Sequence, residues 1–193
     1  MKRVKIWNWQ FILLSLQSDK LHEDMKEVKI KNSVLQKAAE AGMDEFVEVF
    51  TNAIREAIGG ELSSENMSEL NSDQITLLGW NAMHEEVMDG GFVQLIHNGW
   101  GAFIFRNPFD KAVRAWGLAD LCSLVRRGHK LYFKYREELE RECSDDEFMA
   151  LFEKHPEFDD LDDAFVEQEE QFSSAVAHYV DGHISNFATI ENE

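Results

Sequence analysis

The sequence has little proline, little cysteine and few cations in its last third, and each shortage narrows the class of protein. Two prolines and eleven glycines in 193 residues leave room for long helices. Two cysteines, Cys122 and Cys143, provide neither a disulfide framework nor the four ligands of a structural zinc site. We therefore expect a mostly helical protein with two reduced thiols in the cytoplasm.

Enzyme signatures are also missing. The chain has no GxSxG elbow, no Walker loop and no GxGxxG turn in a βαβ unit. His84-Glu85-Glu86 lacks the second histidine of a zinc-protease motif, and the other histidines have no partner at a ligand spacing. We expect no metal, no cofactor and no catalytic residue.

The N-terminus, MKRVKIWNWQFILLSLQSDK, has the basic start and apolar run of a signal peptide. However, Asn8 and Gln10 interrupt the run, no Ala-x-Ala cleavage site follows, and the run is too short to cross a bilayer. We expect residues 1–32 to form an extension packed on the body and residues 33–193 to form a single helical domain. No membrane partner is expected.

Acidic residues are concentrated at one end of the chain, whose formal net charge is −18. Residues 1–37 carry 8 Lys/Arg against 4 Asp/Glu, residues 38–136 carry 9 against 14, and residues 137–193 carry 2 against 19. So acidic a protein repels bare nucleic acid, and no direct nucleic-acid binding is expected. The last segment is either a solubilising surface or a surface for a basic partner.

Capping patterns predict where several helices begin. A side-chain oxygen placed three residues before Gln or Glu can bond the free N–H groups of a first helical turn, and proline favours the first helical position. The start signals are Ser33 with Gln36, Asn71 with Gln74, Asn107 with Pro108 and Ser144 with Glu147; Gly117 and Gly128 mark bends or ends.

The longest helical pattern closes the chain after Pro156. From Leu161 to Phe187 the seam residues recur at steps of four or three, the spacing of one buried helix face. The sequence shows few convincing strands and no internal repeat. We expect an all-α fold, a compact and irregular multi-helix bundle with a long C-terminal helix.

The stretch MDGGFVQLIHN, residues 88–98, places two glycines between two helical segments. Glycine takes positive φ without steric penalty, so the pair can end one helix and start the next at a sharp angle. Gln94 and Asn98 share a helix face and can bond exposed backbone groups of the turn. We expect a structural corner, rather than a ligand pocket, made of Asp89, Gly90, Gly91, Phe92, Gln94 and Asn98.

The pattern Asp89-Gly90-Gly91-Phe92-x-Gln94-x-x-x-Asn98 resembles the signature of a bacterial domain-of-unknown-function family that includes a DNA-mimic protein. The later stretch FDDLDDAFVEQEEQFSSAVAHYVDGHISNF resembles the family's closing segment, and the similarity covers about residues 70–190. The resemblance implies an all-helical, often dimeric protein with no assigned enzyme activity. For the DNA-mimic member it implies a carboxylate-rich surface that occupies the DNA site of a transcription factor.

Acidic rows on the last helices suit such a surface. Carboxylates at i and i+3 or i+4 recur about every 5.4 Å, a coarse match to phosphates that rise about 3.4 Å per nucleotide. We expect a non-enzymatic interaction protein whose partner is a basic protein such as a DNA-binding transcription factor. The candidate partner-binding residues are Asp145, Asp146, Glu147, Asp159, Asp160, Asp162, Asp163, Glu167, Glu169 and Glu170.

Two other functions stay open at this point. The first is an immunity or antitoxin-like protein that binds a toxin nuclease. The second is a small-ligand binder or hydrolase that uses Gln94 and Asn98 with His97 or His84.

Overall fold

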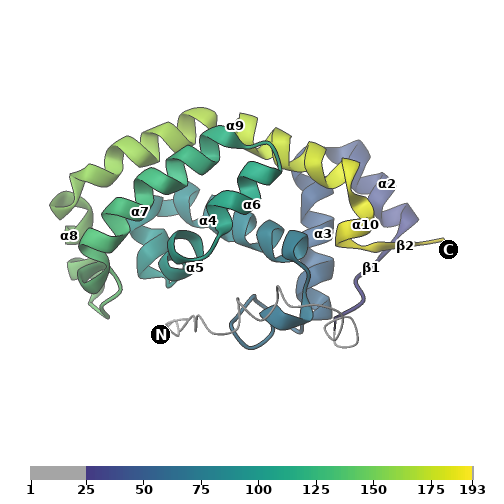
Figure 1. Ribbon diagram of the computed structural model, residues 1–193, viewed down its shortest axis with the longest axis horizontal. Helices are drawn as coiled ribbons and strands as arrows, with labels where there is room; N and C mark the ends of the chain where they lie inside the picture. The colour runs from purple at the N-terminus through teal and green to yellow at the C-terminus, as the bar shows by residue number, and fades with distance from the viewer. Residues whose placement is uncertain (1–24, 193) are drawn as a thin grey trace. The chain divides into compact units, whose positions relative to one another are not determined.

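The computed structural model describes residues 25–192, so the first 24 residues of the expected N-terminal extension lie outside the described residues. The described part contains nine α-helices and two three-residue strands (Figure 1), which confirms the all-α fold. In chain order the elements are β1 (Lys29–Lys31), α2 (Asn32–Ala41), α3 (Met43–Ala57), η2 (Met67–Glu69), α4 (Ser72–His97), α5 (Gly101–Arg106), α6 (Phe109–Ala115), α7 (Ala119–Leu139), α8 (Asp145–Lys154), η3 (Pro156–Phe158), α9 (Asp159–Gly182), α10 (Ile184–Phe187) and β2 (Thr189–Glu191).

The described residues group into two units. The first unit contains residues 79–169, and the second contains residues 25–78 and 170–192. Helices α4 and α9 contribute residues to both units. The single domain expected for residues 33–193 stays a prediction. Within the described ranges, none of the helices combines the length and apolar character needed to span a bilayer.

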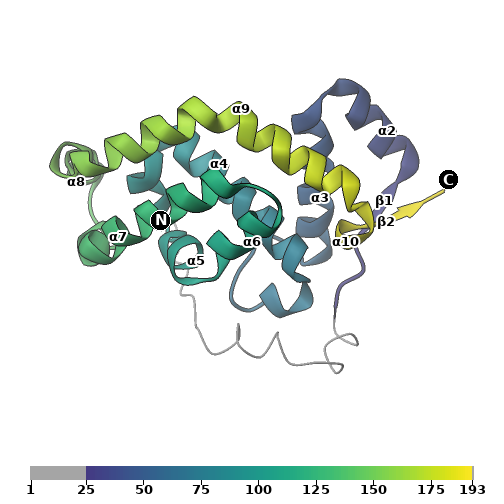
Figure 2. The ribbon, with the colours of Figure 1, turned by 45° about the horizontal axis from the view of Figure 1, so that its top comes forward.

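The first unit has an aromatic core, and α5 and α6 lie against α7 in it (Figures 1 and 2). Phe92, Phe105 and Phe165 are buried, and the Phe92 ring centroid lies 6.1 Å from that of Phe105 and 6.3 Å from that of Phe165. A Cβ on Gly128 would lie 2.6 Å from the Phe105 ring. Gly128 therefore admits that ring within a continuous α7, and the prediction of a bend or a helix end at Gly128 was wrong.

In the second unit, the last described residues of the chain pack against residues near its start. Strands β1 and β2 pair in parallel, with Ile30 opposite Ile190 (Figure 2). Phe50 is fully buried, and its ring lies 6.1 Å from that of Phe187. The Gln74 side chain donates to the Phe187 carbonyl at 2.9 Å, which ties the last short helix to the first turn of α4.

Two of the expected helix starts are confirmed. The Asn71 N–H donates to Gln74 Oε1 at 3.0 Å, and the Gln74 N–H donates to Asn71 Oδ1 at 2.9 Å. Ser144 and Glu147 form the same reciprocal pair at the start of α8. Both pairs are local in sequence, so their spacing alone was enough to predict them.

The other two starts were wrong, by two residues at Ser33 and by one at Asn107. Helix α2 begins at Asn32 because the extended backbone of β1 ends at Lys31, which leaves Ser33 inside the first turn without a capping bond. Helix α6 begins after Pro108, whose carbonyl accepts the first helical N–H groups, and Asn107 is not its cap.

The expected long C-terminal helix is α9, but it ends at Gly182 instead of continuing to Phe187. The His183 N–H donates to the Val180 carbonyl at 3.1 Å, which is a tighter turn than an α-helix makes. The chain then turns into α10, and this turn brings Phe187 to the core of the second unit.

Candidate protein-interaction surface

Three candidate acids occupy the first turn of α8. The capping box of Ser144 starts this helix, and its dipole favours negative charge at that end. Asp145 and Asp146 are exposed, and neither has an ion pair with any described residue. Glu147 is exposed but engaged, because its Oε2 accepts the Ser144 N–H at 2.9 Å, and this bond lowers the pKa of the Glu147 carboxyl.

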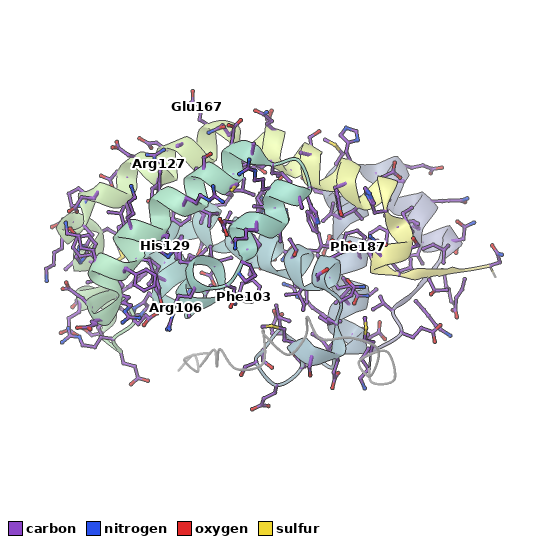
Figure 3. All side chains as sticks on the ribbon, in the orientation of Figure 1. Phe103, Arg106, Arg127, His129, Glu167 and Phe187 are labelled. Atoms are coloured by element: carbon purple, nitrogen blue, oxygen red, sulfur yellow. The ribbon has the colours of Figure 1, made fainter. Side chains whose placement is uncertain are left out.

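Four more candidates lie in the first turns of α9, where Asp159, Asp160, Asp163 and Glu167 are all exposed. Residues four apart stand about 6 Å from each other on one helix face, so Asp159, Asp163 and Glu167 form a row. Figure 3 shows Glu167 pointing outward from α9. Over residues 25–192 no lysine or arginine pairs with these four carboxylates; Arg127 instead donates to the Asp160 backbone carbonyl at 3.5 Å. Glu170, the last candidate in chain order, is exposed and is the first α9 residue of the second unit.

Two candidates differ from the others because they are partly buried and their carboxylates bond residues far away in the sequence, within the first unit. Asp162 Oδ1 accepts the Phe92 N–H at 2.8 Å, and Glu169 Oε1 lies 2.7 Å from His84 Nε2. Burial raises the pKa of the Asp162 carboxyl to about 6, against the lowering effect of the Phe92 bond. The nearby Asp159 and Asp163 raise that pKa further. Asp162 and Glu169 therefore maintain the fold around the exposed row.

Two lysines of this unit bond acids outside the candidate set. Lys154 pairs with Glu138, and this bond lowers the pKa of the Glu138 carboxyl. Glu157 accepts the hydroxyl of Tyr135 and lies 3.3 Å from Lys134, and both bonds, the first above all, lower the pKa of its carboxyl. Arg141 lies 3.9 Å from the candidate Glu147. Over residues 25–192 none of these cations pairs with the α9 row of Asp159, Asp163 and Glu167.

The Gly90-Gly91 pair forms a kink inside α4, with Gly91 at φ 69°. Across this kink, Gln94 Nε2 donates to Asp89 Oδ2 at 2.7 Å and to Glu86 Oε2 at 3.1 Å. Asn98 Nδ2 donates to the same Glu86 oxygen at 2.6 Å. The acceptors are carboxylates rather than the backbone groups that the sequence suggested, and the kink removes any helical spacing that could have singled out Glu86.

The same kink joins the corner to the acidic helix. Because Gly91 leaves the helical conformation, the Phe92 N–H is free to donate to Asp162. A Cβ on Gly91 would lie 2.4 Å from Asp162 Oδ2, so only glycine leaves room for this carboxylate. Sequence reasoning missed the contact because 70 positions separate its two partners.

The side chains on which a small-ligand site would depend are engaged in other contacts. His97 Nδ1 bonds the Leu139 carbonyl at 2.9 Å, and its ring packs 4.6 Å from that of Phe148. His84 bonds Glu169, and the amides of Gln94 and Asn98 bond carboxylates. In the part of the chain that the structure describes, no group of three His, Cys, Asp or Glu side chains is arranged to hold a metal.

Comparison with known proteins assigns this all-α chain to a family. The family model described as DMP19-like protein matches residues 68–183, and the chain belongs to that family. The match includes the glycine corner, α8 and the acidic turns of α9, and it confirms the resemblance inferred from the Asp89–Asn98 pattern. One relative is the DNA mimic protein DMP19 of Neisseria meningitidis serogroup B. It is 30% identical over 131 residues, which cover 67% of this chain and 79% of the relative.

Proposed function

We propose that this protein is a non-enzymatic, cytoplasmic DNA mimic. The exposed carboxylates of α8 and α9 bind a basic, DNA-binding protein in the place that DNA would take. The observation that carries the proposal is the row Asp159, Asp163 and Glu167, which is exposed and has no cation of its own among the described residues. The name of the Neisseria relative supports the same function.

The physical reason is that an unpaired carboxylate row attracts arginine and lysine side chains as phosphates do. A row of like charges raises the local negative potential and steers a cationic partner toward it. The interaction weakens as salt rises, because added ions screen exposed charges beyond about 8–10 Å.

The test is capture of a DNA-binding transcription factor from an extract of the source cell on the immobilised full chain. We expect the bound factor to be released by duplex DNA and not to be retained by a variant in which Asp159→Asn, Asp160→Asn, Asp163→Asn and Glu167→Gln are combined. A matched control removes four exposed acids of the second unit through Glu40→Gln, Asp44→Asn, Glu45→Gln and Glu56→Gln, and should retain the factor. Equal capture by all three proteins would overturn the proposal.

A homodimer, which the family resemblance implies, is part of the proposal. Sedimentation equilibrium of the full chain tests it directly, and a mass equal to one chain at all concentrations would remove this part alone.

A further inference from the structure

Each of the two acidic helices exposes one large apolar side chain. Val166 on α9 is 53% exposed, and Met149 on α8 is 63% exposed. Residues three, four or seven apart share a helix face. Val166 therefore shares a face with Asp163 and Asp159, and Met149 shares one with Asp145 and with Glu153, which is also exposed.

These positions are not part of the core. The buried seam of α9 in the first unit contains Leu161 and Phe165, and Val166 is rotated from Phe165 by about 100°. A single exposed apolar residue is ordinary on a protein surface. Here both lie on a face whose carboxylates pair with no cation among the described residues, which is the arrangement of an interface with an apolar centre and a charged rim.

We propose that Val166 and Met149 are apolar contact points of the target-binding surface. The element that docks there is a cationic amphipathic helix with an apolar side chain among its arginines and lysines. This inference rests on the proposed function and specifies its partner chemistry. Charge complementarity determines the kind of occupant, because the carboxylates need cations and Val166 needs an apolar group.

DNA provides the physical parallel. Its major groove presents thymine methyl groups between two phosphate backbones, and recognition helices contact those methyls with apolar side chains. A surface with carboxylates alone would copy the phosphates only. With Val166 and Met149 it also offers apolar groups to the helix that reads bases.

The test uses a synthetic helical peptide with arginines along one face and a single leucine among them, and the same peptide with serine in place of leucine. Binding to the full chain is measured over a range of salt concentrations. We expect Val166→Ser to weaken binding of the leucine peptide about fivefold without changing the slope of log affinity against log salt. Its effect on the serine peptide should be much smaller, because the two changes remove the same contact. Met149→Ser is tested with a second leucine in the peptide, and the same loss is expected when that leucine is present.

The matched control is Val34→Ser, the same substitution at a side chain that is 48% exposed on the second unit, and it should leave binding unchanged. Asp163→Asn should lower the salt slope instead. If both peptides bind the wild type and Val166→Ser equally, with a salt slope that Asp163→Asn reduces, the apolar contact is refuted while the proposed function stands. If neither peptide binds, or if neutralising Asp159, Asp160, Asp163 and Glu167 changes nothing, both proposals fail.

Discussion

Asp162 lies between Leu161 and Asp163 at the start of α9, and its carboxyl accepts the Phe92 N–H at 2.8 Å. Its role is set by position rather than by residue type, because Asp159, Asp160 and Asp163 are exposed while Asp162 is partly buried. Burial disfavours the ionised form, which explains a pKa raised from 3.8 to about 6. At neutral pH this carboxylate is therefore ionised at a cost to stability.

That cost predicts a pH dependence. The folded-state pKa of about 6 exceeds the unfolded value of 3.8, so between these pH values the folded protein binds more protons than the unfolded chain. The contribution of Asp162 to the free energy of unfolding therefore falls as pH rises through this window.

An asparagine side chain in place of Asp162 would still accept the Phe92 N–H without the charge. We expect Asp162→Asn to be more stable than the wild type by about 1 kcal/mol at neutral pH, with the difference vanishing near pH 4. Urea denaturation across this range measures it, and a variant less stable at every pH would contradict the assignment.

Gly91 lies opposite that carboxylate. Gly91→Ala places a Cβ 2.4 Å from Asp162 Oδ2 at a backbone φ of 69°, so strain and crowding add. We expect a loss of about 2–3 kcal/mol in the free energy of unfolding. Gly117→Ala is the control, because its φ is 91° and no atom lies within 4 Å of its added Cβ. Equal losses at the two glycines would mean that the Asp162 contact contributes nothing.

At the scale of the element, α8 begins with a reciprocal bond between its cap and its third residue. Ser144 Oγ accepts the Glu147 N–H at 3.3 Å, and Glu147 Oε2 accepts the Ser144 N–H at 2.9 Å. The turn held in this way carries Asp145 and Asp146. The cap therefore stabilises the part of α8 that presents carboxylates.

Ser144→Ala removes one side of this box. We expect a loss of about 1 kcal/mol and faster amide hydrogen exchange at Glu147 and Phe148, because the first turn frays. The control is Ser123→Ala, since the Ser123 hydroxyl donates to the Ala119 carbonyl within α7 and caps nothing. That change should alter stability by less than about 0.5 kcal/mol. Unchanged exchange at Glu147 in Ser144→Ala would show that the cap is dispensable.

At the scale of the whole molecule, the formal net charge of −18 acts against folding through self-repulsion. Carboxylates without a partner cation contribute most of this repulsion because nothing local offsets it. Among residues 25–192 neither Asp163 nor Glu167 has a partner cation, and both lie beyond the first turn of α9, where the helix dipole no longer favours them.

Neutralising both residues should therefore stabilise the protein in dilute buffer. We expect Asp163→Asn with Glu167→Gln to raise the free energy of unfolding by about 1 kcal/mol at low salt, and the gain to disappear near 1 M salt, where the Debye length is about 3 Å. Urea denaturation of the variant and the wild type at the two salt concentrations measures this gain. A gain that persists at high salt would point to a cause other than charge repulsion.

Helix starts were predictable from the sequence wherever the cap and its partner are three residues apart, as at Asn71 with Gln74 and at Ser144 with Glu147. The start at Ser33 failed because a strand pairing with residues near the end of the chain determines where α2 begins. The glycine corner was recognisable from Gly90-Gly91. Its acceptor Glu86 was not, because it bonds Gln94 and Asn98 across a non-helical break.

The sequence by itself determined the helical class, the family and the excess of acid in the last third, because these depend on composition, periodicity and short-range spacing. Only the tertiary structure decided which carboxylates bond other groups of the protein and which stay exposed. Asp162 bonds a backbone group 70 residues away and Glu169 bonds a histidine 85 residues away, while neighbours with the same chemistry stay exposed. Pairing needs atoms within about 3 Å of each other, and only folding brings such distant positions that close.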